Sequence, residues 1–328
     1  MVVFTVEITR ITVITSFCII SALYLLVKAI RRRYFAYRIG RSLKNQVFMI
    51  TGATHGLGKV TAMELASHGA SVYMACRNPK LAQNIADDIK KQTSNENVYV
   101  LELDLCCFDS VRQCAASFLK KETPLHCLIN NAGIFPPGKR EVTKDGLEIA
   151  MQSNHYGHFL LTNLLIDVLR SSAPARIINI SSFASFRLQQ FNLDNINFDS
   201  HYYFRDVYQT SKLANILFTR QLAVICRGTG VTANCCHPGI IFTNIWNNSS
   251  VIVSILSLIF LSTFGFGNTI HDGARTQVYL ATSNDLIHTS GHLFAGCKPV
   301  ALPRIALNDQ LCEMFWDLSE RVTQSSKR

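Results

Sequence analysis

The segment that most constrains the fold is a glycine-rich turn, TGATHGLGK, at residues 51–59. It follows an apolar run, VFMIT (47–51), that is typical of a buried strand, and it opens a helix-length stretch. Gly52, Gly56 and Gly58 have the spacing GxxxGxG. The first glycine of such a unit permits a tight turn, and the later ones let a pyrophosphate approach the amino end of the helix. A glycine triplet alone is a weak signal, but its place between a strand and a helix predicts a dinucleotide-binding loop.

Apolar runs alternate with helix-length segments along most of the chain. Further strands are expected at 71–76, 98–104, 126–130, 175–181, 231–236 and 292–295. Helices are expected at 56–68, at 79–91, from about 109, around 146–170, from about 207 and at 272–283. This alternation predicts right-handed crossovers, and so a single α/β domain of Rossmann type. We expect a doubly wound parallel sheet of about seven strands with helices on both faces.

The amino-terminal segment has the pattern of a membrane anchor. No charge interrupts the 17 residues from Ile11 to Val27, which as a helix would span roughly 25 Å, near the lower limit for a bilayer core. Seven basic residues follow with no acid between them, namely Lys28, Arg31, Arg32, Arg33, Arg38, Arg41 and Lys44. A cleaved signal peptide is the alternative, but its charges would precede the apolar run and an A-x-A site would follow it. We therefore predict a transmembrane helix with the downstream domain facing the cytosol.

Charge and cysteine usage limit the class of partner. The formal net charge is +10, yet seven of the ten excess charges lie in the basic run, so no basic stripe for nucleic acid remains. The 11 cysteines include no C-x-x-C pair and no zinc-ligand spacing. We expect reduced thiols in a cytosol-facing domain, no metal site and no nucleic-acid partner.

Two residues after strands bear on the choice of cofactor. An NAD site usually has an acid after its second strand to bind the ribose 2′-hydroxyl, whereas SVYMAC (71–76) is followed by Arg77. Arg77 could pair with a 2′-phosphate, which favours NADP, although a solvated surface arginine is the plainer interpretation. Asp104, after the third strand, is placed to meet the adenine ring or to cap a helix.

Tyr208 and Lys212 suggest proton-transfer chemistry. They lie four apart in the helical segment VYQTSKLANILF, so they share one helix face. A nearby ammonium is expected to lower the pKa of a tyrosine, which can then exchange a proton with an alcohol or carbonyl oxygen. Ser181 and Ser182 end the strand ARIINISS, where a hydroxyl could bind the substrate oxygen. Taken singly, Tyr208 and Lys212 could be a surface contact, and the two serines could be turn residues.

Asparagines follow the fourth strand and recur on the next helix. NNAG occupies 130–133, and Asn154 lies in MQSNHYGHF. Buried asparagines tie strands together or hold an ordered water.

Together these motifs, with HPG (237–239) and a following Thr243, resemble the short-chain dehydrogenase/reductase family over about 45–320. The anchor, the ACR strand end, SKLANILFTRQLA and GARTQVYLAT are most similar to the microsomal retinol dehydrogenase branch. The organisation implied is an anchor with its basic flank at 1–44, the catalytic domain at 45–320 and a polar tail at 321–328.

The resemblance implies roles for the matching residues. Tyr208 would be the acid/base, Lys212 would bind the nicotinamide ribose and lower the tyrosine pKa, and Ser182 would orient the substrate oxygen. Asn154 would hold a water of the proton relay. The NADP(H)-binding set would be Gly52, Thr54, His55, Gly56, Leu57, Gly58, Arg77, Asp104, Asn131, Ala132, Gly133, Tyr208, Lys212, Pro238, Gly239 and Thr243. His55 stands where relatives often have a small or hydroxyl residue, so it could touch phosphate or crowd the loop.

The segment around 240–270 bears on the substrate. Residues 251–266 are almost wholly apolar and uncharged, which suits a lipophilic substrate lid, a membrane contact or a buried core helix. The resemblance implies a membrane-anchored NADP(H)-dependent oxidoreductase of the endoplasmic reticulum that interconverts retinol and retinal. Steroid or lipid-derived carbonyls are the alternative substrates, and a catalytically silent nucleotide-binding scaffold is the alternative class. Expected partners are a lipophilic small molecule and membrane lipid, and relatives commonly form homo-oligomers.

Overall fold

The computed structural model describes residues 15–27, 29–30, 37–239 and 269–325. An eight-stranded sheet forms its centre, in the order β3-β2-β1-β4-β5-β6-β7-β8. The strands are β1 (Val47–Thr51), β2 (Ser71–Cys76), β3 (Val98–Glu102), β4 (Cys127–Asn130), β5 (Ala175–Ile180), β6 (Val231–Cys236), β7 (Leu293–Ala295) and β8 (Lys298–Val300). The first seven pair in parallel, and β8 returns antiparallel to β7. The predicted α/β parallel sheet is thus confirmed, with the strand order reversing between β1 and β4.

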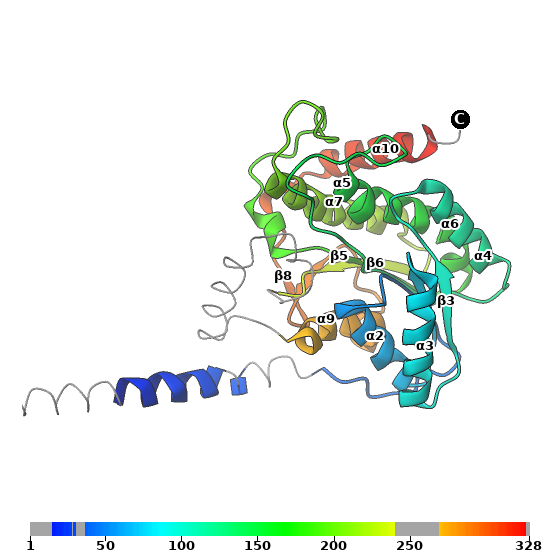
Figure 1. The fold of residues 1–328 in the computed structure, drawn as a ribbon, viewed down its shortest axis with the longest axis vertical. Coiled ribbons are helices and arrows are strands. Elements are labelled where there is room, and N and C mark those ends of the chain that lie inside the picture. The colour runs from blue at the N-terminus through cyan, green and yellow to red at the C-terminus, as the bar shows by residue number, and fades with distance from the viewer. Residues whose placement is uncertain (1–14, 28, 31–36, 240–268, 326–328) are drawn as a thin grey trace, which may run out of the picture.

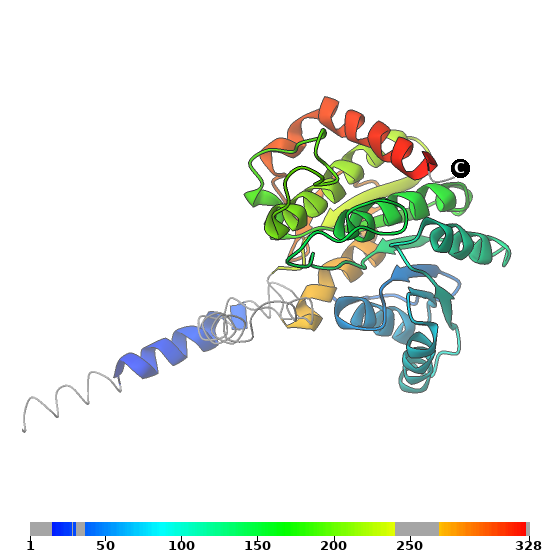
Figure 2. The same cartoon turned by 45° about the horizontal axis from the view of Figure 1, so that its top comes forward.

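Helices cover both faces of this sheet (Figures 1 and 2). On one face lie α4 (Phe108–Leu119), α5 (Ile149–Met151), α6 (Gly157–Ser171), α7 (Phe204–Ile225) and α10 (Asp309–Ser325). On the other lie α2 (Gly56–Ser67), α3 (Pro79–Thr93) and α9 (Ile270–Thr282). A π-helical turn, Gln152–Tyr156, joins α5 to α6.

Alternate residues of the central strand divide the core into two apolar layers. Met49 packs in one cluster with Leu161 and Leu217, whereas Ile50 packs in the other with Leu65. All five residues of β1 are buried, as the uniform apolar run predicts for a parallel strand covered on both faces. In register, Thr51 lies opposite Ala75 of β2, while Ile50 lies opposite Ile129 of β4. The carboxyl ends of β1 and β4 therefore meet.

Two elements at the carboxyl end of the chain differ from expectation. The sheet has eight strands instead of about seven, because KPV at 298–300 adds an edge strand. That strand is short and contains Pro299, which lacks an N–H for the ladder, so its sequence does not read as a strand. Residues 321–325, expected in a polar tail, continue α10. Thr323 is only 3% exposed and Val322 packs on the core, so their burial extends the helix.

Residues 15–27 are helical and lie away from the body of the domain (Figure 1). Within the described ranges, no helix combines the length and apolarity needed to cross a bilayer. The expected lid or membrane-contact segment at 251–266 lies outside the described residues.

Candidate active site

The glycine loop turns tightly at the amino end of α2 and is called the cradle below. Gly52 and Gly56 have φ values of +68° and +54°, in the left-handed region that favours glycine. A Cβ on Gly58 would lie 2.5 Å from the carbonyl oxygen of Gly52 and 2.6 Å from the Asn131 side-chain nitrogen. The first turn of α2 has no acid, and its N-cap residue makes no side-chain capping bond. The close packing and the uncapped, positively polarised helix end fit a pyrophosphate.

The three residues Thr54, His55 and Leu57 of the loop differ in how far they are exposed to solvent. His55 is the N-cap residue of α2, and its exposed ring forms a 2.9 Å hydrogen bond with the Thr54 hydroxyl. Leu57 lies half-buried in the first helical turn. Thr54 and His55 therefore border the loop from the solvent side.

A buried hydroxyl joins the end of β1 to the NNAG segment after β4. The Thr51 oxygen accepts hydrogen bonds of 2.9 Å from the backbone N–H groups of Asn131 and Ala132. The Asn131 side chain donates in turn to the Thr51 carbonyl, at 2.8 Å. Gly133 follows, where an added Cβ would lie 3.0 Å from the Lys212 nitrogen. The cradle and the predicted proton-transfer residues are thus adjacent.

Arg77 and Asp104 follow β2 and β3 at the same edge of the sheet. Arg77 is exposed directly after β2, as a phosphate-binding arginine would need to be. The Asp104 carboxylate accepts from the backbone N–H of Cys106 at 2.9 Å, and the N-cap residue of α4 is Cys107. Asp104 therefore closes the turn before the helix, and its contact with adenine stays a prediction.

The π-helical turn carries Asn154 into the site. Its side-chain oxygen accepts from the Ile134 N–H at 2.8 Å, and its nitrogen donates to the Ile134 carbonyl at 3.0 Å and the Ser211 hydroxyl at 2.9 Å. An added Cβ on Gly133 would lie 3.2 Å from the same side-chain oxygen. Asn154 is fully buried, so these bonds fix its amide beside the Lys212 nitrogen.

Helix α7 brings Tyr208 and Lys212 to the carboxyl end of β5. The Lys212 nitrogen lies 5.8 Å from the centre of the Tyr208 ring and donates to the Ile180 carbonyl at 3.3 Å. The two serines after β5 have different neighbours. The Ser182 hydroxyl lies near the phenol of Tyr208 and lowers its pKa, whereas Ser181 donates to the Lys212 carbonyl at 2.7 Å. Ser182, Tyr208 and Lys212 therefore form one constellation.

The pKa of Tyr208 differs from the expected direction. Burial raises the pKa of the phenol, and the hydrogen bond with Ser182 opposes that rise. Burial also lowers the pKa of Lys212 to about 8, which reduces the share of positive charge it holds near neutral pH. In the protein alone, burial therefore raises the tyrosine pKa, the opposite of the direction expected from a neighbouring ammonium.

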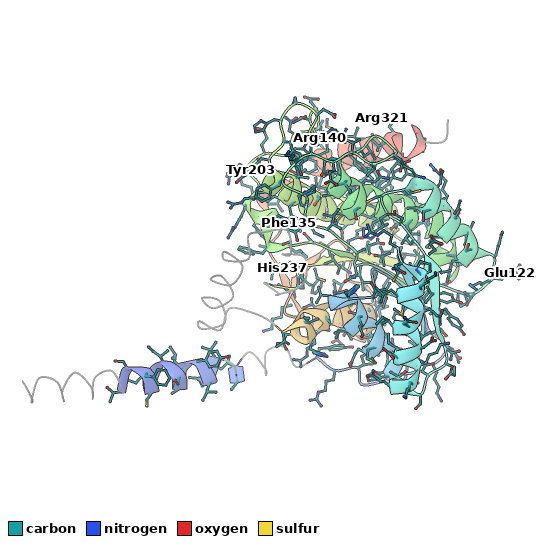
Figure 3. The ribbon with its side chains drawn as sticks, in the orientation of Figure 1. Glu122, Phe135, Arg140, Tyr203, His237 and Arg321 are labelled. Atoms are coloured by element: carbon teal, nitrogen blue, oxygen red, sulfur yellow. The ribbon has the colours of Figure 1, made fainter. Side chains whose placement is uncertain are left out.

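Aromatic side chains surround the tyrosine. The ring of Phe135 lies 4.8 Å from that of Tyr208, and Phe204 lies 5.8 Å from Phe135. After Ser182, the ring of Phe183 lies 6.0 Å from that of His237. Figure 3 shows Phe135 and His237 along one edge of the molecule. The surroundings of the predicted proton-transfer residue are therefore largely aromatic.

The HPG segment follows the carboxyl end of β6. Pro238 and Gly239 are half-buried, and Gly239 has a φ of +84°. Thr243, the last residue of the predicted cofactor set, lies outside the described residues.

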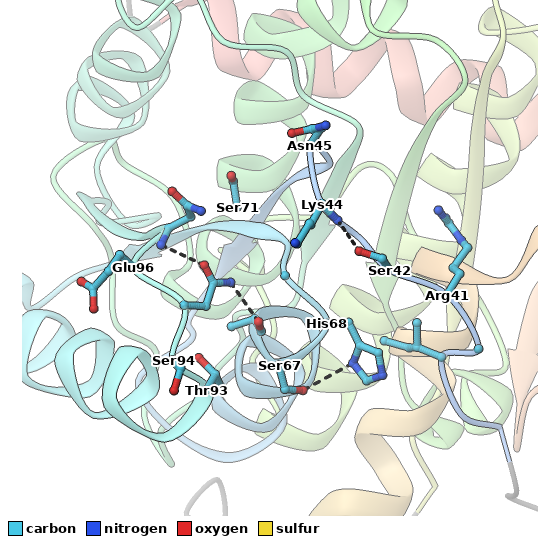
Figure 4. Close-up of a pocket in the computed structure, with 16 residues that line it drawn as sticks. Arg41, Ser42, Lys44, Asn45, Ser67, His68, Ser71, Thr93, Ser94 and Glu96 are labelled. Atoms are coloured by element: carbon cyan, nitrogen blue, oxygen red, sulfur yellow. Dashed lines mark hydrogen bonds between the residues drawn. The ribbon is translucent and has the colours of Figure 1, made fainter.

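A surface groove of about 930 Å³ lies at the opposite, amino end of the strands (Figure 4). Lys44, His68, Ser94 and Asn95 are among its lining residues, and none of the predicted site residues contributes to it. Within 37–239 and 269–325, no three His, Cys, Asp or Glu side chains gather as metal ligands. The chemistry-bearing residues therefore converge at the carboxyl ends.

Sequence reasoning assigned no role to several residues of the site. Thr51 was seen only as the residue where the strand ends and the glycine-rich turn begins, and Phe135 and Ser211 had no distinguishing pattern. His158 lies four residues after Asn154, and this helical spacing was the one available signal that the two interact.

Comparisons with known proteins agree with this geometry. The sequence profile described as short chain dehydrogenase matches residues 46–251. Retinol dehydrogenase 12 of Bos taurus is 40% identical over 311 residues, covering 93% of this chain and 95% of the relative. Human retinol dehydrogenase 14 is 38% identical over 291 residues, covering 85% of this chain and 86% of the relative.

Solved structures give the same fold. An uncharacterized protein from Mycobacterium paratuberculosis has a TM-score of 0.71 at 32% identity, covering 88% of this chain and 97% of that one. The Pseudomonas aeruginosa RhlG/NADP active-site complex has a TM-score of 0.62 at 23% identity, covering 80% and 96%. At that identity the second likeness concerns the fold alone.

Proposed function

Because this chain belongs to the short-chain dehydrogenase/reductase family, in its retinol dehydrogenase branch, we propose that it interconverts retinol and retinal with NADP(H). The observation that carries the chemistry is that Ser182 and the buried Lys212 both lie beside Tyr208 at the carboxyl end of β5. Extended similarity to retinol dehydrogenases and the aromatic surroundings of Tyr208 support a lipophilic substrate.

The residues of the glycine loop fit a dinucleotide, and Arg77 favours its phosphorylated form. Gly52 and Gly58 allow the loop to pack closely against Ala132 and Asn131, at the amino end of α2 where the pyrophosphate would bind. No acid follows β2, so the residue there, Arg77, would pair with a 2′-phosphate. When bound, NADPH supplies the hydride.

The chain itself would bind the carbonyl and move the proton. Ser182 would donate a hydrogen bond to the substrate oxygen, and Tyr208 would transfer its phenolic proton to that oxygen as negative charge develops there. Lys212, in its charged form, would stabilise the phenolate left behind. Asn154, fixed by Ile134 and Ser211, would hold a water through which that phenolate is reprotonated.

We further propose that the amino-terminal segment anchors the enzyme to the endoplasmic reticulum membrane, with the catalytic domain in the cytosol. The helical residues 15–27 expose large apolar side chains, among them Phe17 at 72% and Leu25 at 62%. Such a surface is unusual beside water, and the basic run that follows suits the cytosolic side of a bilayer. Deleting residues 1–28 should release the protein from membranes; tight association after the deletion would point to residues 251–266 instead.

The decisive experiment assays membranes containing the enzyme with all-trans-retinal, comparing NADPH with NADH. We expect retinol formation with NADPH, and its loss by about a thousandfold in Tyr208→Phe, which removes only the proton carrier. NADPH binding should survive in that variant, as fluorescence titration can measure. Near-normal turnover of Tyr208→Phe would overturn the mechanism, whereas wild-type binding of NADPH without turnover of retinal would redirect the search to steroid or lipid-derived carbonyls.

A further inference from the structure

His158 lies at the centre of a buried hydrogen-bonded chain that the proposed reaction does not use directly. It sits on α6, is 1% exposed, and its Nε2 atom lies 2.8 Å from the Thr51 hydroxyl oxygen. Its Nδ1 atom lies 3.1 Å from the carbonyl oxygen of Asn154. The imidazole therefore joins the end of β1 to the π-helical turn.

The hydrogen bonds on the two sides of the imidazole indicate which of its nitrogens carries the proton. A hydroxyl oxygen can accept two hydrogen bonds and donate one. The Thr51 oxygen already accepts from the N–H group of Ala132 and from that of Asn131, which is shared with the Ile129 carbonyl at 3.0 Å. These two bonds favour donation of the hydroxyl proton to Nε2 of His158, which leaves the histidine proton on Nδ1.

The other half of the chain is consistent with that assignment. The carbonyl oxygen of Asn154 can only accept, so it requires the proton that Nδ1 carries. Burial, aided by the charge of Lys212, lowers the pKa of His158 to about 4, against the hydrogen bond to Asn154, which raises it. An imidazolium would direct a second N–H at the Thr51 hydrogen, and it is disfavoured here.

The two ends of this hydrogen-bonded chain, Thr51 and Asn154, belong to different parts of the site. Thr51 adjoins Gly52 and holds Asn131, so its end belongs to the cofactor cradle. The carbonyl of Asn154 belongs to the residue whose side chain lies beside the Lys212 nitrogen. We infer that His158, as a neutral Nδ1–H imidazole, is a positioning residue that holds Asn154 in place and ties it to the cradle at the end of β1.

Two variants test the two hydrogen bonds of His158 separately. His158→Asn places an amide nitrogen near the Nδ1 position, so it can retain the donor to Asn154 while losing the acceptor for Thr51. His158→Gln places an amide oxygen near the Nε2 position, so it can retain the acceptor for Thr51 while losing the donor to Asn154. This inference rests on the proposed oxidoreductase function, but its cofactor arm is measurable without a substrate.

We expect opposite defects from the two variants. His158→Asn should weaken NADPH binding about fivefold, the equivalent of one hydrogen bond, by fluorescence titration. His158→Gln should keep NADPH affinity within twofold and lower kcat at least about tenfold, because small displacements at a reacting site are costly. The pH profile of kcat should shift in His158→Gln, since Asn154 serves the proton relay.

His155 provides the matched control. It lies three residues earlier, and its Nε2 atom hydrogen-bonds with Ser319 of α10 at 2.9 Å instead of with Thr51. His155→Phe should lower thermal stability while kcat per folded enzyme and NADPH affinity stay within about twofold. An equal kinetic loss in His155→Phe would reduce the effect of His158 to general packing and overturn the inference.

A direct test of the imidazole uses ¹⁵N-histidine-labelled enzyme and long-range ¹H–¹⁵N spectra, with the His158→Asn spectrum for assignment. We expect a neutral Nδ1–H signal that does not titrate between pH 5.5 and 9. An Nε2–H tautomer, a titrating ring, or wild-type kinetics in both His158 variants would overturn the inference. If the wild-type enzyme reduces no retinoid, the substrate proposal fails, whereas the tautomer and NADPH affinity still decide the role of His158.

Discussion

The two ends of the sheet differ in how they use polar side chains. At the carboxyl ends, Thr51, Asn154 and Lys212 are each at most 4% exposed and held at fixed distances by hydrogen bonds. At the amino ends, a broad groove contains the exposed Lys44, Ser94 and Glu96. The groove and the predicted chemistry therefore lie at opposite ends of the strands. Parallel strands place their following loops, and so the groups that can converge on a ligand, at the carboxyl end.

The two serines after β5 should differ most in their effect on catalysis. Ser182→Ala removes the hydroxyl that bonds with Tyr208, and we expect kcat for retinal to fall about a hundredfold. Ser181→Ala removes the bond to the Lys212 carbonyl, so it should cost about 1–2 kcal/mol of stability and change kcat only a few-fold. Steady-state kinetics and urea unfolding of both variants provide the measurement. Equal kinetic losses would mean that the constellation acts through packing alone.

A second prediction concerns the cradle at the end of β1. In Gly58→Ala, the added methyl would meet the Gly52 carbonyl and the Asn131 side chain, so the loop must shift. We expect NADPH affinity to fall about tenfold or more and stability to fall by about 1–3 kcal/mol. Gly138→Ala is the matched control, because a Cβ there meets nothing within 4 Å. Unchanged NADPH binding in Gly58→Ala would place the cofactor elsewhere.

The cradle and Tyr208–Lys212 were predictable because short, local patterns encode them. Glycine spacing after an apolar strand, and two residues four apart on a helix, fix relative positions without tertiary information. His158, Thr51 and the pKa of Tyr208 were not predictable in this way. Their behaviour depends on which segments meet in the fold and on how much water is excluded there. The carboxyl-terminal helix was missed because its burial becomes visible only against α6 and α7.

A third prediction uses the burial of Lys212. Its pKa in the fold is about 8, below the value of an unfolded lysine, so the unfolded chain binds more protons between these values. Stability should therefore rise with pH through that window, relative to a variant without the amine. We compare the free energies of unfolding of wild type and Lys212→Met in urea. From pH 8 to pH 9.5, we expect the stability of wild type relative to the variant to rise by about 1–2 kcal/mol. A constant difference would show that Lys212 has an ordinary pKa in the fold.

The smallest kinetic effect should come from the groove. Asn95 is buried at its base and donates to the carbonyl oxygens of Ala66 and Ala70, at 2.9 and 2.8 Å. Asn95→Ala should cost about 1–3 kcal/mol in urea unfolding, because both carbonyls lose a donor. Lys44→Ala, on the exposed rim, should change stability by less than about 0.5 kcal/mol. Neither variant should alter kcat or NADPH affinity, because the groove and the site lie at opposite ends of the strands. A kinetic defect in Lys44→Ala with normal stability would show that the amino end communicates with the chemistry, and the separation between the two ends would no longer hold.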